Sequence, residues 1–335
     1  KMEEGTIHHV FDGGWIWVIP FCNHKKSSNS LTSVGLLLDS RKYPVPEDCS
    51  PEEEFNTWIK KFPKVYEHLK NGKPVREWVR TEGRIQYTSK EVVGDRWALL
   101  GHAAGFIDPL YSKGIYSSLK SVFTFAQLFI KAHKSQDYTR EAFLPLEKST
   151  LECIRNNDLI VSKSYDSFKS PELWRKTQVL WLLGAYTEFL KLLTVRMRSS
   201  KSRDKYFNDI LKLKLIGGGF DDFQKFSKDI YAFIDSTEGK TRDEIETIAL
   251  EMQKCFEEQP WIEPRFYAIL NGKKCLPKNK FRFELLKPLI SKNKYHEHFF
   301  GDSGVPRIDI FVLGEFFKYS AFPLAVKRRL KVGEK

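Results

Sequence analysis

The sequence predicts an α+β protein in which a strand-rich part, residues 1–135, precedes a mostly helical part, residues 136–335. Two patterns predict this division. Up to about residue 115, short apolar or alternating runs are separated by Gly, Asn and Ser, which is typical of strands joined by turns. From Gly114 onward, apolar residues recur every three or four positions, as on one face of an α-helix. Hydrophobic residues make up 41% of the chain, enough for a sizeable buried core.

Five strands are expected in the first part: Ile7–Phe11, Gly14–Phe21, Leu31–Leu38, Gly83–Ser89 and Trp97–Leu100. The last run is short and apolar and ends at a glycine, as a buried strand that leads into a loop would. Ser50, Pro51 and Glu53 form a helix start in which Ser50 is the N-cap and Glu53 completes a capping box. A second short helix is expected over residues 65–70.

The second part contains several helical stripes. The first stripe, which we expect to be the buried face of a long helix, consists of Ile115, Leu119, Val122, Ala126 and Phe129. Further helix signals are a start at Ser170–Glu172, a stripe of Phe223, Phe226, Ile230 and Phe233, a capping box of Thr241 and Glu244, and a short helix over Leu285–Ile290. Gly217–Gly219 predicts a turn between helices.

Composition excludes several classes of function. The net charge of +12 is spread out, with denser basic stretches at residues 196–205, 273–282 and 327–335, which indicates a solvated basic surface or an anionic partner. No nucleic-acid-binding signature accompanies these charges, so no nucleic acid partner is expected. The five cysteines and eight histidines match no metal or redox spacing, so we expect free thiols, a cytoplasmic location and no metal. No run is long and apolar enough to span a membrane.

The first segment that points to chemistry is the second expected strand. Trp15, Trp17 and Ile19 fall on one face of it, and Pro20 ends its hydrogen-bonding ladder. Two tryptophans two residues apart predict a flat aromatic wall. The alternative is that they fill an ordinary core.

The second segment runs from Trp97 to Ile115 and reads as strand, small-residue turn, loop and helix. Its turn is built from residues that let a backbone approach a ligand closely, namely Gly101, Ala103, Ala104 and Gly105. Ser112 is expected to cap the following helix. Gly114 lies in the first helical turn, where N–H groups and the helix dipole favour an anion such as reduced flavin. An ordinary strand-to-helix connection is the alternative.

Together the two segments resemble flavin-dependent halogenases of the tryptophan-halogenase-like family. That family has a W-x-W-x-I-P motif, which Trp15, Trp17, Ile19 and Pro20 match. It also has a flavin-binding segment of the form G-D/N-A-A-G/C-F-x-D/E-P-L-x-S-x-G. The matching positions here are Gly101, Ala103, Ala104, Phe106, Asp108, Pro109, Leu110, Ser112 and Gly114. The resemblance covers about His8 to Phe129 well and the helical half only loosely.

The resemblance implies an FAD-binding fold related to aromatic hydroxylases, here truncated, followed by a helical extension. It implies that reduced FAD, supplied by a partner reductase or NAD(P)H, reacts with oxygen to a flavin hydroperoxide that halide attacks, so that an electron-rich aromatic or other small molecule is halogenated. That substrate is free or tethered to a carrier protein. The implied cofactor-binding residues are Gly101, His102, Ala103, Gly105, Asp108, Pro109, Ser112 and Gly114. Lys113 and Gly114 would hold the halide, and Trp15, Trp17, Ile19, Pro20 and Tyr111 would line the tunnel and substrate region.

Three features depart from the family pattern. His102 stands where the family has Asp or Asn, and a neutral imidazole makes only one comparable hydrogen bond. Tyr111 stands where the indole halogenases have Glu. This tyrosine points to a phenol- or pyrrole-type member of the family, or to a relative with other chemistry. No G-x-G-x-x-G fingerprint followed by a helix occurs, and no lysine can be nominated as catalytic.

Because the family's fingerprint and lysine lie before the W-x-W-x-I-P motif, we expect the chain to be N-terminally truncated and to bind FAD weakly or not at all. Stoichiometric yellow protein would contradict this. The alternatives are an FAD-dependent monooxygenase without a halide step and an inactive fragment that retains the pocket.

Overall fold

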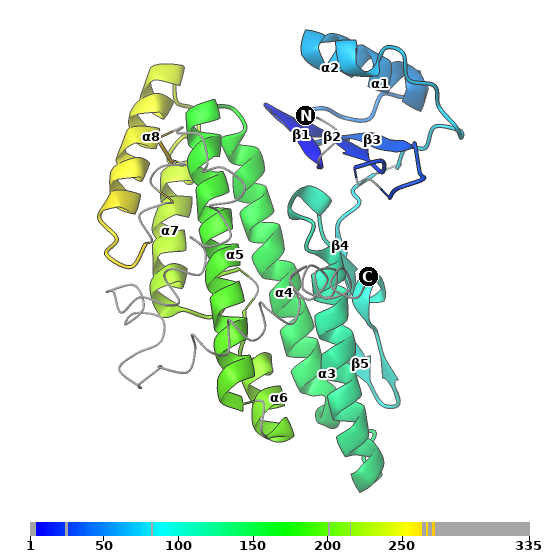
Figure 1. The fold of residues 1–335 in the computed structure, drawn as a ribbon, viewed down its shortest axis with the longest axis vertical. Coiled ribbons are helices and arrows are strands. Elements are labelled where there is room, and N and C mark those ends of the chain that lie inside the picture. Colours follow the sequence, from blue (N-terminus) through cyan, green and yellow to red (C-terminus); the bar gives the residue numbers. More distant parts are fainter. Residues whose placement is uncertain are drawn as a thin grey trace, which may run out of the picture. The chain divides into compact units, whose positions relative to one another are not determined.

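The computed structural model describes residues 5–23, 26–81, 83–199, 202–214, 216–262, 266, 270 and 271 (Figure 1). The helix expected over Leu285–Ile290, Cys275 and the basic stretches at 273–282 and 327–335 lie outside the described residues. The four other cysteines are free thiols. In the described part of the chain, no helix is both long and apolar enough to cross a membrane.

The chain folds as two compact units. Unit 1 comprises Lys1–Gln178 and Tyr231–Ala249, and unit 2 comprises Val179–Ile230 and Leu250–Lys335. The division that the sequence predicts after residue 135 coincides with the end of a helix, α3, but unit 1 continues beyond it. Both motifs lie in unit 1.

Unit 1 begins with an antiparallel sheet in the order β1 (Ile7–Phe11), β2 (Gly14–Pro20), β3 (Thr32–Leu38). These strands agree with the predicted ones to within one residue at each end. The register pairs Trp17 with His8 on one side and with Gly35 on the other. Side chains of paired residues share a face of the sheet, so this register decides what surrounds each tryptophan.

Helices α1 (Pro51–Lys60) and α2 (Pro63–Leu69) cover one face of this sheet. The predicted capping box is confirmed: the amide of Glu53 donates to Oγ of Ser50 at 3.2 Å, and the amide of Ser50 donates to the Glu53 carboxylate at 3.0 Å. The core beneath the helices is formed by Ile16, Val18, Phe55, Ile59 and Val65.

Two short hairpin pairs follow, β4 (Tyr87–Thr88) with β7 (Gly105–Phe106) and β5 (Val93–Gly94) with β6 (Trp97–Ala98). They are shorter than predicted, because only two residues of the expected strand Gly83–Ser89 are paired. The expectation that Trp97 begins a buried strand is wrong, since its side chain is 45% exposed. Its indole covers Gly94 of its own hairpin, where a Cβ would lie 2.2 Å from Nε1.

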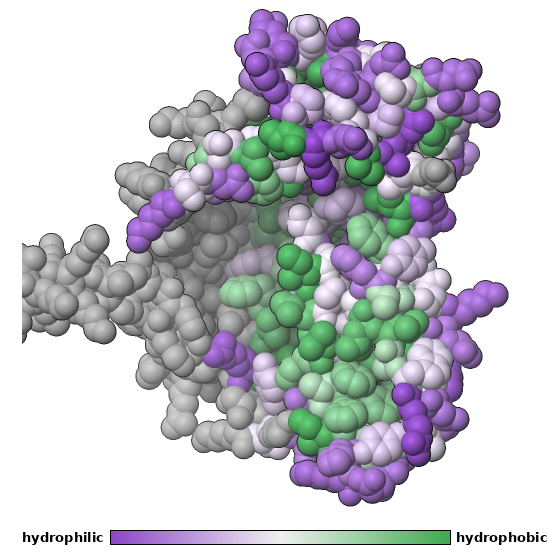
Figure 2. Space-filling model, turned by 90° about the vertical axis from the view of Figure 1, so that its right-hand side faces the viewer, coloured by the Kyte–Doolittle hydropathy of each residue, from purple (hydrophilic) through white to green (hydrophobic). Residues whose placement is uncertain are grey.

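Helix α3 (Gly114–Ser135) packs on α4 (Arg140–Ser167) through a face that the sequence pattern did not predict. The buried residues of α3 are Ser121, Thr124, Leu128 and Ala132, whose mostly small side chains allow close approach. The predicted stripe points outward: Ile115 is 76% exposed and Leu119 65%. Hydrophobic side chains gather on the side of the molecule that Figure 2 presents. The prediction that this stripe is core is therefore wrong.

The remaining helices are α5 (Pro171–Ser199), α6 (Arg203–Leu211), α7 (Asp221–Asp235) and α8 (Arg242–Glu257). The predicted helix start at Ser170 and the capping box of Thr241 and Glu244 are confirmed. Gly217–Gly219 form the expected turn, and all three have positive φ. In unit 2, Phe223, Phe226 and Ile230 are buried as predicted.

Candidate functional site

The tryptophan strand β2 presents its two indoles on the face that is turned away from α1 and α2. Trp15 is 2% exposed, whereas Trp17 is half-buried. Ile16 and Val18 point to the opposite face, as the alternation predicts. The two ring centroids are 5.7 Å apart and their planes are tilted by 52°. The pair is therefore not the flat wall that the sequence suggested, because strand twist and different neighbours orient each ring separately.

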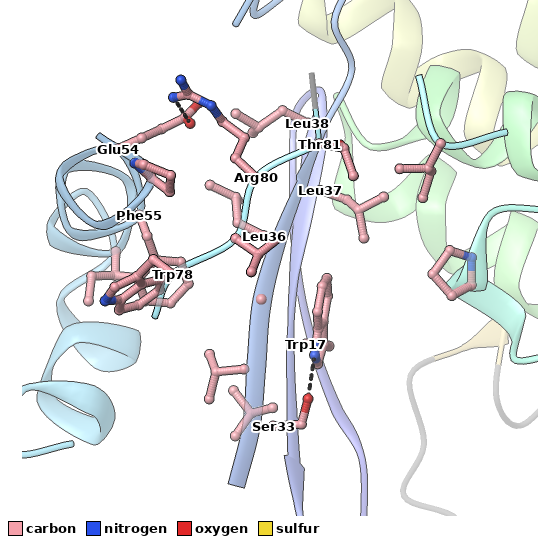
Figure 3. Close-up of a pocket in the computed structure, with 18 of the residues that line it drawn as sticks. Trp17, Ser33, Leu36, Leu37, Leu38, Glu54, Phe55, Trp78, Arg80 and Thr81 are labelled. Atoms are coloured by element: carbon pink, nitrogen blue, oxygen red, sulfur yellow. Dashed lines mark hydrogen bonds and ion pairs between the residues drawn. The ribbon is translucent and has the colours of Figure 1, made fainter. Parts of the chain in front are cut away.

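The neighbouring strand β3 holds the Trp17 indole in place. A Cβ built on Gly35 would lie 2.0 Å from the indole atom Cζ2, so the ring lies directly over the glycine backbone. Nε1 of Trp17 donates a hydrogen bond to Oγ of Ser33 at 3.2 Å (Figure 3). A glycine and a serine two residues apart on β3 thus fix the position of the ring.

The second motif folds as a compact turn between β6 and α3. Gly101 has φ +54° and opens a 3₁₀ turn, η2 (Gly101–Ala103). Asp108 caps a second 3₁₀ turn, η3 (Pro109–Tyr111), by accepting a hydrogen bond from the Leu110 amide at 2.8 Å. Ser112 adopts the left-handed conformation, with φ 54°, and its amide donates to the Pro109 carbonyl.

The prediction that Ser112 caps α3 is wrong, since the N-cap is Lys113 and its side chain makes no capping hydrogen bond. The Lys113 ammonium instead lies 5.2 Å from the ring centroid of Tyr116. The first turn of α3 therefore offers its amides and the positive end of its dipole without a side-chain acceptor from the N-cap.

The glycines of this turn have different surroundings. A Cβ on Gly114 would meet only Nε2 of His102, at 3.6 Å, so space is open beside the helix start. A Cβ on Gly105 would lie 2.7 Å from Cδ1 of Ile154 and 2.8 Å from the Tyr87 carbonyl oxygen. Gly105 therefore serves packing against α4 and β4, whereas Gly114 borders the space that a ligand would need.

A small hollow of about 10 Å³ lies inside this turn, among Gly101, His102 and Gly114. That volume holds about one water molecule. A ring system as large as a flavin does not fit in this hollow. On the outer surface of the turn, His102 is exposed and space is open beside Gly114. The His102 ring packs on Phe106, and its backbone carbonyl accepts a hydrogen bond from the Tyr87 hydroxyl.

One hydrogen-bonded network joins the two motifs. Nε1 of Trp15 donates to the Tyr165 hydroxyl on α4 at 2.9 Å, and that hydroxyl donates to Oδ2 of Asp108 at 3.1 Å. Nε2 of Gln86 donates to the same carboxylate oxygen at 3.1 Å. Burial raises the pKa of Asp108 to about 6, although the hydrogen bonds from Leu110, Tyr165 and Gln86 oppose the shift.

Tyr111, which the resemblance places in the substrate region, faces α4. It is 8% exposed, and its hydroxyl shares a 2.6 Å hydrogen bond with Oγ of Ser164. Burial raises its pKa above the ordinary value for tyrosine. Its substrate role stays a prediction.

A cavity of about 1660 Å³ runs along β3 within unit 1. Figure 3 shows that both faces of the sheet border it, with Trp17 and Leu37 on one side and Leu36, Phe55 and Trp78 on the other. An ion pair at 3.0 Å between Arg80 and Glu54 lies at its wall, and Arg80 also donates to the carbonyl of Cys49 at 2.9 Å. The volume exceeds that of a typical pocket for a small ligand, about 300–1,000 Å³.

The structure brings the predicted cofactor and halide residues together in one turn. Of the predicted tunnel residues, Trp17 and Pro20 line the cavity, as does Pro109 of the turn. Sequence reasoning missed three contributors: Tyr165, Gln86 and Gly35. No local signal marks the first two, whereas the alternation of β3 could have paired Gly35 with Trp17.

Comparisons with known proteins show the family of the chain. A family model described as tryptophan halogenase matches residues 6–218. The chain is 34% identical over 289 residues to monodechloroaminopyrrolnitrin halogenase PrnC of Pseudomonas fluorescens, a match that covers 84% of this chain and 50% of that protein. It is 39% identical over 202 residues to tetracycline 7-halogenase of Kitasatospora aureofaciens, covering 60% of this chain and 36% of that protein.

A solved structure shows the same likeness. The crystal structure of halogenase PltM in complex with phloroglucinol and FAD aligns with a TM-score of 0.72 and 29% identity. The alignment covers 80% of this chain and 54% of PltM. The chain thus spans about half the length of PrnC and of PltM.

Proposed function

The chain belongs to the tryptophan halogenase family, and from this premise we propose that it forms the part of an FAD-dependent halogenase that faces the isoalloxazine ring, the halide and the substrate. The observation that carries the proposal is the joining of the two motifs. The turn before α3 and the tryptophan strand β2 meet through Tyr165, which contacts Trp15 and Asp108 together. A halogenase site needs a flavin next to an aromatic-lined substrate region, so it requires these two motifs to lie side by side.

The residues at the start of α3 fit a flavin and a halide. Gly114 leaves open space, the helix N-terminus attracts an anion, and the exposed His102 offers an imidazole nitrogen to the ribityl or phosphate region. We propose that Lys113 and Gly114 bind the halide through the backbone. When bound, reduced FAD supplies the activation of dioxygen that is needed to oxidise the halide.

For the substrate we propose a free, electron-rich aromatic molecule that enters the cavity along β3. Trp17 offers a ring face whose position β3 fixes, and Leu37, on the same face of the sheet, offers an apolar contact. A separate flavin reductase is the proposed source of reduced FAD. An acyl group tethered to a carrier protein is the alternative substrate.

The activity test supplies the chain with saturating FAD, NADH, a flavin reductase, bromide and phloroglucinol, and analyses the products by mass spectrometry. We expect a product with the isotope doublet of bromine that is absent without bromide. A hydroxylated product that forms equally well without bromide would identify a monooxygenase and refute the proposal.

A matched pair of variants tests the site itself. Gly114→Ala places a methyl group at ordinary contact distance from His102 and fills the space beside the helix start, whereas Gly5→Ala meets nothing within 4 Å. We expect the affinity for reduced FAD or for bromide to fall about tenfold or more in the first variant, which is roughly 1.4 kcal/mol. It should not change in the second. Equal affinities in the two variants would remove the helix start from the site.

A further inference from the structure

Three groups form a chain of hydrogen bonds whose donors all point in one direction. The indole N–H of Trp15 donates to the Tyr165 hydroxyl, and the Tyr165 hydroxyl donates to the Asp108 carboxylate. The distances are 2.9 Å and 3.1 Å. In such a chain each bond polarises the next, so the indole N–H responds to the charge at the far end.

These two hydrogen bonds are buried inside the protein. Trp15 is 2% exposed and Asp108 1%, and Tyr165 packs its ring against Phe168 at 4.9 Å. In a shielded environment, a hydrogen bond to a charged group is stronger than one in water. The charge on Asp108 therefore polarises the Trp15 indole through these two hydrogen bonds, with little screening by solvent.

We propose that Tyr165 is a positioning residue that fixes the Trp15 indole and the Asp108 carboxylate in one geometry and transmits the protonation state of Asp108 to the tryptophan strand. Its place in the reaction rests on the function proposed above, but the coupling itself does not. While Asp108 is ionised, the hydroxyl of Tyr165 is held with its proton toward Oδ2 and its lone pairs toward Trp15. When Asp108 takes up a proton, the charge that holds this orientation disappears.

One titratable group packs directly on Trp15: the ring centroid of His8, on β1, lies 4.7 Å from that of Trp15, and burial lowers the pKa of His8. The other charged and titratable groups around the three residues come from four elements. On α4, Asp158 acts on Asp108 and raises its pKa, while Arg84, in the segment before β4, acts on Asp158. Tyr111 of η3 is influenced by Asp108, and Asp39, which follows β3, influences Tyr165. None of these four donates to Oδ2 of Asp108 in the described residues, where Tyr165 and Gln86 do.

The test follows the indole N–H of Trp15 by proton–nitrogen NMR in the chain labelled with nitrogen-15 tryptophan. Trp15→Phe assigns the signal among the eight tryptophans. We expect the Trp15 signal to shift with pH with a midpoint of about 6, following Asp108. Tyr165→Phe should move it to the position of a weaker hydrogen bond and abolish the pH dependence.

Two further variants keep the test decisive. Asp108→Asn retains Tyr165 and removes only the ionisation, so the midpoint near 6 should also be lost. Tyr66→Phe changes a tyrosine that packs against the core on the other face of the sheet, and the Trp15 signal should titrate as in the wild type. A pH dependence that survives in Tyr165→Phe or Asp108→Asn, or that is missing in the wild type, would overturn the proposal.

The measurement needs no flavin, halide or substrate. A hydroxylated product that forms equally well without bromide, together with an intact titration, would refute the proposed function and leave the coupling standing. The reverse outcome would refute the coupling alone.

Discussion

Replacing Asp108 by asparagine tests the energetic cost of the buried carboxyl. Folding raises the pKa of this group from 3.8 to about 6, mainly through desolvation. At roughly 1.4 kcal/mol per pKa unit, the shift corresponds to about 3 kcal/mol of stability that depends on pH.

The sign follows from the protons bound in each state. Below pH 3.8 the carboxyl is protonated in both the folded and the unfolded chain, and burying it carries no charge penalty. Between pH 3.8 and about 6 the folded chain binds more protons, so the free energy of unfolding falls as the pH rises. Above that window the full penalty of about 3 kcal/mol is present. Asparagine has no such penalty at any pH.

The assay is urea unfolding of the wild type and Asp108→Asn at a series of pH values between 4 and 8. We expect the free energy of unfolding of the variant, relative to the wild type, to increase by about 2–2.5 kcal/mol from pH 4 to pH 8, because contributions of all other groups cancel in the difference. The rest of the shift lies below pH 4, where the unfolded carboxyl begins to ionise. Asp39→Asn is the matched control, since a hydrogen bond from Arg41 lowers the pKa of that carboxyl. Its relative stability should stay nearly constant over this range, because a lowered pKa places its titration below pH 3.8. A difference for Asp108→Asn that does not change with pH would refute the reasoning.

Three further predictions concern packing. Gly35→Ala forces the Trp17 indole off the strand, and we expect a loss of about 1–3 kcal/mol in unfolding free energy together with a change in tryptophan emission. Leu119→Glu, on the exposed face of α3, should change stability by less than about 0.5 kcal/mol, whereas Leu128→Ala, on its buried face, should cost about 2–5 kcal/mol. If thermal unfolding showed a larger loss for Leu119→Glu than for Leu128→Ala, the buried face of α3 would be the one that the sequence predicted. Arg80→Met leaves a carboxylate and a backbone carbonyl without their donor, and we expect a loss of about 2 kcal/mol by urea unfolding. A loss below about 0.5 kcal/mol would show that the ion pair contributes little there.

The sequence predicted those elements whose signals are local. The capping boxes at Ser50 and Thr241 and the turn at Gly217–Gly219 each lie within four residues, and each has the predicted structure. The alternation of β2 also predicted which side chains share a face. In all these cases the deciding contacts are made between near neighbours in the chain.

The sequence did not predict features that depend on distant partners. Periodicity identifies an apolar stripe on α3, but not which face α4 covers, and the covered face is the one with Ser121 and Thr124. Tyr165 lies 150 residues from Trp15 and 57 from Asp108. It occurs in a polar helix with no motif of its own, so only the folded chain assigns it to the site.

The indole of Trp17 lies across a strand that the tryptophan motif does not include. A protein with both tryptophans but a residue larger than glycine opposite Trp17 would keep the motif and lose this orientation of the indole ring. A transfer of this tryptophan strand into another scaffold must therefore include the paired strand with its glycine, because the Trp17 ring occupies the space that a side chain at position 35 would fill.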